Sequence, residues 1–143
     1  MNKYYKTYLA GKMSGLTFEE MNTWRIGCKC MLSMAALNKE YKICVINPVD
    51  FYNFKKVEYQ SEDEVMDYDL MHVNDSDFLI VNLDQINTST GTQIEIYDAW
   101  KSNKPIFAFG ECENLHPWID RCITRKEKDY IQVINYLENF YFI

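Results

Sequence analysis

Three neighbouring stretches decide the fold of this chain: Asp77-Phe-Leu-Ile-Val-Asn-Leu83, Asn87-Thr-Ser-Thr-Gly-Thr-Gln-Ile-Glu95 and Ile106-Phe-Ala-Phe109. The first and third are apolar runs typical of buried strands, and the polar stretch between them predicts a glycine-containing loop that enters a helix. Glu95 is expected in or near the first turn of that helix. A strand–loop–helix–strand unit brings a loop and a helix N-terminus to the edge of a parallel sheet, where ligands bind.

The same alternation of strands and helices continues on both sides of this unit. Five strands are predicted, at 5–10, 42–46, 77–83, 105–109 and, briefly, 121–124. Besides the helix that carries Glu95, helices are predicted from Thr17 to about Asn38, from Ser61 to about Asn74, and from Lys126 to about Phe140. The first two begin with capping boxes, in which Ser or Thr precedes a Glu by three residues. Val49–Gln60 is expected to be a long loop, and a short helical turn is expected around Trp118.

Strands that alternate with helices of this length predict a parallel sheet covered on both faces. We expect one domain over residues 1–143, an α/β three-layer, doubly wound, flavodoxin-like (Rossmann-like) fold with the parallel strand order 2-1-3-4-5. In such folds ligands bind at the carboxyl ends of the strands. Gly11–Gly15, the residues after Leu83 and the loop after Phe109 should then surround one crevice.

Composition limits the possible partners. The formal net charge of −6 argues against binding a nucleic acid polymer, which needs a basic surface, although a local pocket can still hold one nucleotide. Five scattered cysteines, with Cys28 and Cys30 too close for a zinc knuckle, predict neither a metal site nor a disulfide framework. No apolar run approaches the length of a membrane span, and no secretion signal is evident. A soluble, cytoplasmic protein without a cofactor is therefore expected.

Glu95 is the strongest candidate for chemistry. A helix start favours the ionised form of a carboxylate, and an ionised carboxylate suits nucleophilic displacement at an anomeric carbon. The alternative is that Glu95 is one of the many acids found in first helical turns. Asp69 either protonates a leaving base or holds a sugar hydroxyl, or it is a solvated acid on a helix face.

Ser89, Thr90, Gly91 and Thr92 could cradle an anion with hydroxyl and N–H groups, but the same residues also form ordinary turns and helix caps. The chain lacks both the phosphate-loop pattern G-x-x-x-x-G-K-[ST] and the dinucleotide pattern G-x-G-x-x-G. His116, in a predicted loop before a proline, is a better ligand-binding candidate than the other histidine, which lies in a predicted helix.

Taken in order, these motifs resemble the nucleoside 2-deoxyribosyltransferase family. The residues that carry the resemblance are Tyr8-Leu-Ala-Gly-Lys-Met13, Asp69 with the run 77–83, Gly91-Thr-Gln-Ile-Glu95, Ala99 and Lys104-Pro105. They cover the chain from about Tyr5 to Phe109. The resemblance implies a flavodoxin-like fold and a two-step reaction with retention, in which Glu95 attacks C1′ of a 2′-deoxynucleoside and expels the base. Asp69 would act as proton donor or orienter, while Tyr8 and Gly11 would line the sugar site and Tyr8 would position the nucleophile.

Ser89 departs from the pattern of the family members that act on free nucleosides, which tend to carry an acid six residues before the nucleophile. A serine resembles instead the branch that hydrolyses 2′-deoxynucleoside 5′-monophosphates, because a hydroxyl donates to a phosphate that a carboxylate would repel. A monophosphate substrate is therefore favoured. The resemblance also implies a homo-oligomer in which His116 reaches a neighbouring subunit's site. The expected substrate-binding residues are Gly11, Lys12, Met13, Ser14, Ser89, Gly91 and His116.

Two other functions compete with this enzyme. A non-catalytic protein that binds or sequesters nucleotides would use the same scaffold and the same crevice. Flavin binding also suits the fold, but it rests on fold analogy alone.

Overall fold

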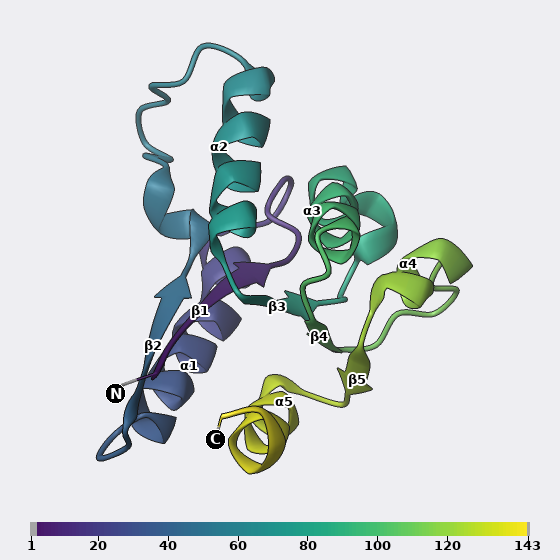
Figure 1. Cartoon of the computed structure of the whole chain (residues 1–143). Helices are drawn as coiled ribbons and strands as arrows, with labels where there is room; N and C mark the ends of the chain where they lie inside the picture. Colours follow the sequence, from purple (N-terminus) through teal and green to yellow (C-terminus); the bar gives the residue numbers. More distant parts are fainter. Residues whose placement is uncertain (1–2, 143) are drawn as a thin grey trace.

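A parallel sheet forms the centre of the protein in a computed structural model that describes residues 3–142. Its strand order is β2-β1-β3-β4-β5 and each neighbouring pair is parallel, as the sequence predicted (Figure 1). The strands are β1 (Lys3–Ala10), β2 (Tyr41–Ile46), β3 (Phe78–Asn82), β4 (Ile106–Phe109) and β5 (Arg125–Glu127). In register, Ala10 of β1 pairs with Val81 of β3, so these two strands end side by side.

Helices cover both faces of the sheet, which confirms the three-layer α/β/α prediction (Figure 1). One face packs against α1 (Phe18–Ala35) and α5 (Tyr130–Tyr136), and the other against α2 (Glu62–Asp75), α3 (Thr90–Lys101) and α4 (Pro117–Cys122). Side chains of β3 alternate between the two cores: Phe78 and Ile80 join the first, Leu79 and Val81 the second. All four are fully buried, as expected of a strand at the centre of a parallel sheet.

Both predicted capping boxes are present. The hydroxyl of Thr17 accepts from Glu20 N at 3.1 Å, and Oε1 of Glu20 accepts from Thr17 N at 3.1 Å. Ser61 and Glu64 make the equivalent pair at the start of α2. The helix α1 ends at Ala35, before the predicted Asn38, which has a left-handed backbone with φ 61°. The predicted long loop includes a short 3-10 helix at Pro48–Phe51, and a second one lies at Ile86–Thr88.

Two boundaries near the C-terminus were predicted wrongly. The strand expected at 121–124 overlaps α4, which starts at Pro117 and ends at Cys122; the fifth strand follows at Arg125–Glu127. The final helix begins at Tyr130 rather than Lys126, because residues 125–127 pair with β4 and the side chain of Asp129 then caps the helix. It continues through a π-helical turn at Leu137–Tyr141. Over residues 3–142, no helix combines the length and apolar character that crossing a membrane requires.

Candidate functional site

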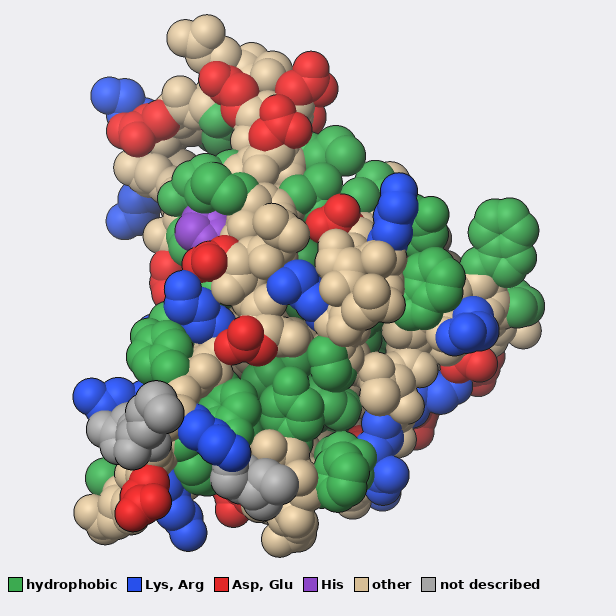
Figure 2. Space-filling model, viewed as in Figure 1, with side chains coloured by type: hydrophobic (Ala, Val, Ile, Leu, Met, Phe, Trp, Pro, Cys, Tyr) green, Lys and Arg blue, Asp and Glu red, His purple; other side chains and the backbone are tan. Residues whose placement is uncertain are grey.

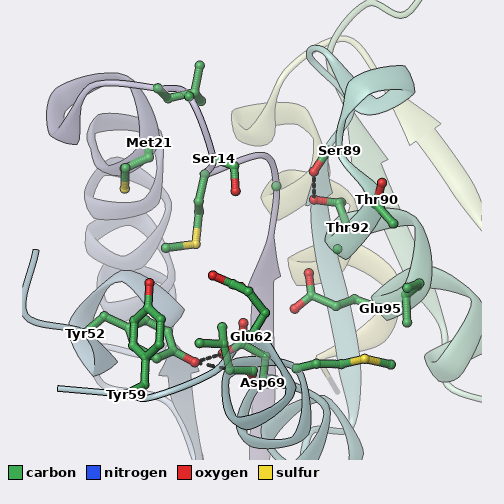
Figure 3. A pocket seen from close by; sticks show the side chains of 18 of the residues that line it. Ser14, Met21, Tyr52, Tyr59, Glu62, Asp69, Ser89, Thr90, Thr92 and Glu95 are labelled. Atoms are coloured by element: carbon green, nitrogen blue, oxygen red, sulfur yellow. Dashed lines mark hydrogen bonds between the residues drawn. The ribbon is translucent and has the colours of Figure 1, made fainter. Parts of the chain in front are cut away.

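A cavity of about 720 Å³ opens at the carboxyl ends of β1 and β3. Its walls come from four places: the loop 11–16 after β1, Met21 of α1, parts of the segment 52–70 that includes the first half of α2, and residues 88–95 at the start of α3 (Figure 3). This volume falls within the range of small-molecule binding sites. The cavity is therefore the crevice that the doubly wound topology predicted at the ends of β1 and β3. The loop after Phe109, which was also expected to surround it, does not line it.

Glu95 points from α3 into the cavity, across from Glu62 and Asp69 (Figure 3). It is the sixth residue of α3, and only 8% of its surface is exposed because its neighbours Ile96 and Ala99 pack into the core. Its Oε2 atom is buried and has no hydrogen-bond partner among residues 3–142. A buried, unsatisfied carboxyl oxygen costs about 1–3 kcal/mol, so its position calls for a functional explanation.

The expectation that the helix start keeps Glu95 ionised is wrong. Burial, together with the charge of Asp69, raises the pKa of Glu95 to about 8, although Tyr8 and Arg25 act in the opposite direction. The dipole effect is confined to the first helical turn, and Glu95 lies in the second. Desolvation therefore dominates, and the carboxyl of the unliganded site is mostly protonated at neutral pH.

Tyr8 was expected to line the sugar site, but neither it nor Arg25 is among the residues that line the cavity. Both are almost completely buried, with 1% and 0% of their surfaces exposed. Burial and the nearby charges of Glu95 and Asp69 raise the pKa of Tyr8, so its hydroxyl stays protonated and can donate to the Glu95 carboxylate. The sequence reasoning missed Arg25. The signal was present, because Arg25 lies four residues after Met21 and three before Cys28, on the apolar stripe of α1.

Asp69 comes from α2 and is held by Tyr52, whose hydroxyl donates to Oδ1 at 2.6 Å (Figure 3). Burial raises the pKa of Asp69, and the hydrogen bond from Tyr52 opposes that shift. The protonated form that a general acid needs is thus more accessible than in a solvated aspartate. Tyr52 was not predicted as a site residue because it lies in a segment without clear periodicity.

Hydroxyl groups gather where α3 begins. Ser89 and Thr92 share a hydrogen bond of 2.6 Å between their side-chain oxygens (Figure 3). Ser89 occupies the N-cap position, yet within the described chain no side chain caps the first N–H groups of α3. Together with Ser14, Thr90 and Gly91, which also line the cavity, this rim is polar but carries no charged side chain.

The other predicted residues divide into two groups. Gly11, Met13 and Ser14 line the cavity, as do Ser89 and Gly91. Lys12 does not: its Nζ donates to Thr88 Oγ1 at 2.8 Å and to Gln85 Oε1 at 3.4 Å, which ties the first loop to the loop after β3. His116 also lies outside the cavity of its own chain. Its Nδ1 accepts a hydrogen bond from Trp118 N at 3.1 Å and so caps α4.

The mouth of the cavity is partly acidic. Figure 2 shows acidic side chains gathered at the end of the molecule where α2 begins, and Glu62 and Asp63 of that first turn line the cavity. Among the residues described, no group of three or more His, Cys, Asp and Glu side chains has a metal-binding arrangement. The five cysteines are free thiols.

Comparison with known proteins identifies the fold. No protein-family model and no curated protein sequence match the chain. A solved structure of a 2-deoxyribosyltransferase from Bacillus psychrosaccharolyticus matches with a TM-score of 0.68 and 22% identity, over 92% of this chain and 91% of that one. A conserved protein from Enterococcus faecalis V583 matches with a TM-score of 0.77 and 15% identity, over 95% and 98% of the two chains. A 3-dehydroquinate dehydratase-like protein from Bifidobacterium longum matches with a TM-score of 0.52 and 8% identity, over 97% and 98%.

The chain therefore has the fold of a 2-deoxyribosyltransferase along nearly its whole length. At the level of fold, this likeness supports the resemblance that the sequence motifs indicated. At these identities the likeness concerns the fold, so the chemistry has to be argued from the site itself.

Proposed function

We propose that this protein is an enzyme of the nucleoside 2-deoxyribosyltransferase type, which cleaves the N-glycosidic bond of 2′-deoxynucleosides or their 5′-monophosphates. One observation carries the proposal: a buried glutamate with an unpartnered oxygen lies in the wall of a cavity large enough for a small molecule such as a nucleotide. Asp69 and Tyr8, the two other residues that the family resemblance implies, lie close enough to act on it, Asp69 through its charge and Tyr8 through hydrogen bonding. The proposed substrates are small molecules, and no nucleic acid polymer or cofactor takes part.

In the proposed first step, a carboxylate oxygen of Glu95 attacks C1′ while the bond from C1′ to the base breaks. The electron pair of that bond leaves with the base, to which Asp69 gives a proton, and a deoxyribosyl ester of Glu95 remains. In the second step an acceptor base or water attacks C1′, loses a proton to the Asp69 carboxylate, and releases the carboxylate of Glu95. Two displacements at the same carbon retain its configuration. Tyr8, protonated at neutral pH, orients the carboxylate through its hydroxyl.

The rim at the start of α3 supports a 5′-monophosphate as the favoured substrate. Free N–H groups at a helix start and neighbouring hydroxyls are suitable donors to a phosphate. Ser89 brings no negative charge to that point, whereas an acid there would repel the phosphate. Lys12 does not line the cavity and contributes indirectly in this proposal. Its hydrogen bond to Thr88 holds that residue in place beside Ser89.

Product analysis tests the proposal directly. The protein is incubated with panels of deoxynucleosides and deoxynucleoside monophosphates, with and without an acceptor base, and the products are separated by chromatography. Free base and deoxyribose 5-phosphate indicate hydrolysis of a monophosphate, whereas a new nucleoside indicates transfer. Base release that survives unchanged in E95Q would refute the mechanism.

We also propose that the active form is a homo-oligomer in which His116 completes the site of a neighbouring subunit. His116 lies at the start of α4, beside Trp118, which is 80% exposed. Sedimentation and activity measured over the same concentration series test this. Full activity of a monomer at nanomolar concentration would contradict it.

The raised pKa of Glu95 favours one alternative, a non-catalytic nucleotide-binding protein. A carboxyl that is protonated at neutral pH is a hydrogen-bonding group rather than a nucleophile. Tight binding of a nucleotide without any turnover between pH 6 and pH 9 would support this alternative over the enzyme.

A further inference from the structure

Arg25 is a fully buried cation on α1 whose guanidinium reaches the backbone of Gly11, a residue that lines the cavity. Its guanidinium donates to three backbone carbonyls: Leu9 O at 3.4 Å, Gly11 O at 2.9 Å and Met21 O. It also lies 4.6 Å from the ring centre of Trp24. These contacts attach α1 to the end of β1 and to the first residue of the loop that lines the cavity.

The guanidinium has no carboxylate partner within ion-pair distance in the described part of the chain. A buried charge is costly unless it is paired, and neutral carbonyls compensate only part of that cost. Burial lowers the pKa of Arg25 to about 10, so the group stays cationic at neutral pH. Its unpaired charge acts on Tyr8, Glu95 and Asp69, the three residues of the proposed mechanism.

We propose that Arg25 is a positioning residue that makes Glu95 available as a nucleophile, by supplying the buried positive charge near its carboxylate and by fixing the backbone where the cavity loop begins. The inference rests on the proposed function for its catalytic meaning. Its physical content, that Arg25 controls the ionisation of Glu95, can be tested without a substrate.

The groups around Glu95 show why this cation matters. Tyr8 faces it from β1, Asp69 from α2 and Arg25 from α1. Glu62 and Asp63 add two further acids to the cavity wall, and no Lys, Arg or His is among the lining residues. Among residues 3–142, the charges that act on Glu95 are those of Asp69 and Arg25, of which that of Arg25 is positive. Removing the charge of Arg25 would leave the Glu95 carboxylate surrounded by other acids, which would raise its pKa further.

Gly11 is the residue at which the Arg25 guanidinium meets the backbone of the cavity loop. A Cβ atom at this position would lie 2.8 Å from the Trp24 ring and 3.4 Å from Nη2 of Arg25. Glycine therefore permits the close approach that lets Arg25 reach the Gly11 carbonyl. This packing requires glycine at position 11, independently of the substrate contact that the sequence predicted for Gly11.

The decisive experiment compares R25Q with R25K, because both lose the guanidinium contacts and only R25Q loses the charge. The Glu95 carboxyl is titrated by ¹³C NMR in protein with labelled glutamate, and its signal is assigned by its absence in E95Q. We expect the R25Q midpoint to rise by about one pH unit or more, a tenfold weaker acid, whereas R25K stays near the wild-type midpoint. Unchanged titration in R25Q would overturn the proposal.

Circular dichroism checks whether each variant folds. If R25Q does not fold, R25K alone decides: a Glu95 midpoint near that of the wild type supports control by charge, and a shift above about one pH unit contradicts it.

The pH profile of kcat/KM for base release then adds the catalytic test. Its rising limb should move to higher pH in R25Q and not in R25K, so activity falls about tenfold at pH 7 and much less at pH 9. Absence of base release in all proteins, with the expected titrations, would refute the proposed function and leave the role of Arg25 intact.

Discussion

The floor and the rim of the cavity are built on opposite principles. What we call the floor is a set of ionisable groups that act on one another: Asp69 and Glu95 line the cavity, while Tyr8 and Arg25 are fully buried and are not among the lining residues. The rim, formed by Ser14, Ser89, Thr90 and Gly91, consists of neutral donors at the start of a helix. Groups with shifted pKa values are suited to chemistry, whereas neutral hydrogen-bond donors are suited to holding a ligand.

This contrast indicates how the two regions can be separated by experiment. Changes in the floor should alter the rate of the chemical step and its pH dependence. Changes in the rim should alter which substrate is used, through binding, and leave the pH dependence intact.

Replacing Glu95 should abolish base release. E95A and E95Q are expected to lower kcat by about 10³-fold or more, because no other group in the floor is placed to form the covalent ester. The measurement is single-turnover base release followed by chromatography. E62Q is the matched control: it changes another glutamate of the same cavity, an exposed one, and should stay within about threefold of the wild type. An equal loss in both variants would contradict the special role of the floor.

Replacing Asp69 should cause the second-largest loss of activity. D69N removes the proton that the leaving base accepts, and kcat is expected to fall by about 10²-fold or more. Y52F keeps the carboxyl but removes its hydrogen bond, so the loss should be below about tenfold. Because that bond lowers the pKa of Asp69, the Y52F profile should also stay active to a higher pH on its falling limb. A loss of kcat in Y52F as large as that in D69N would show that the orientation of the Asp69 side chain, and not its proton transfer, accounts for its contribution to catalysis.

Substitutions at Ser89 should change substrate preference. S89A is expected to lower kcat/KM for a deoxynucleoside monophosphate by about tenfold, the value of one hydrogen bond to a charged group, and to leave the free nucleoside unaffected. S89D should reverse the preference through repulsion of the phosphate. T92V is the control, because it removes the hydrogen-bond partner of Ser89 and retains the serine hydroxyl. Equal losses for both substrates would place Ser89 outside the phosphate site.

The smallest effect concerns stability. The pKa of Glu95 is about 8 in the folded protein and close to its ordinary value when unfolded, so the stabilisation is complete at low pH and is lost as the pH rises toward 8. Glutamine does not titrate. E95Q should therefore unfold at a temperature higher by roughly 3–8 °C at pH 8.5, and by much less at pH 5. Calorimetry at the two pH values measures this difference. A difference independent of pH would mean that ionisation of Glu95 does not limit stability.

Much of the fold was predictable from local patterns. Apolar runs, capping boxes and the strand–helix alternation identified the sheet, its order and the crevice, since each signal is carried by residues close in sequence. The errors at 121–129 have the same origin. There the β5 segment Arg125-Lys-Glu127 is short and charged, and only its pairing with β4 makes it a strand.

The site was predicted less completely, and the gap has a physical cause. Glu95 and Asp69 were identified as residue types suited to the chemistry, but their ionisation was not predictable, because pKa values depend on burial and on groups distant in the sequence. Lys12 was expected to face a phosphate, yet its partners Thr88 and Gln85 lie on a loop more than seventy residues away. Tyr52 gave no signal in sequence, and the place of Arg25 on the apolar stripe of α1 indicates burial but not a function.

Local patterns of residues were enough to predict the layers of this protein, the edge of the sheet where the cavity opens, and the polar segment that supplies a carboxylate there. The electrostatics of that carboxylate depend instead on packing between segments that are distant in the chain. Packing of α1, α2 and α3 around β1 withdraws Glu95 from water and brings the positive charge of Arg25 close enough to act on it. Desolvation and charge act through space, so no local pattern of residues records them.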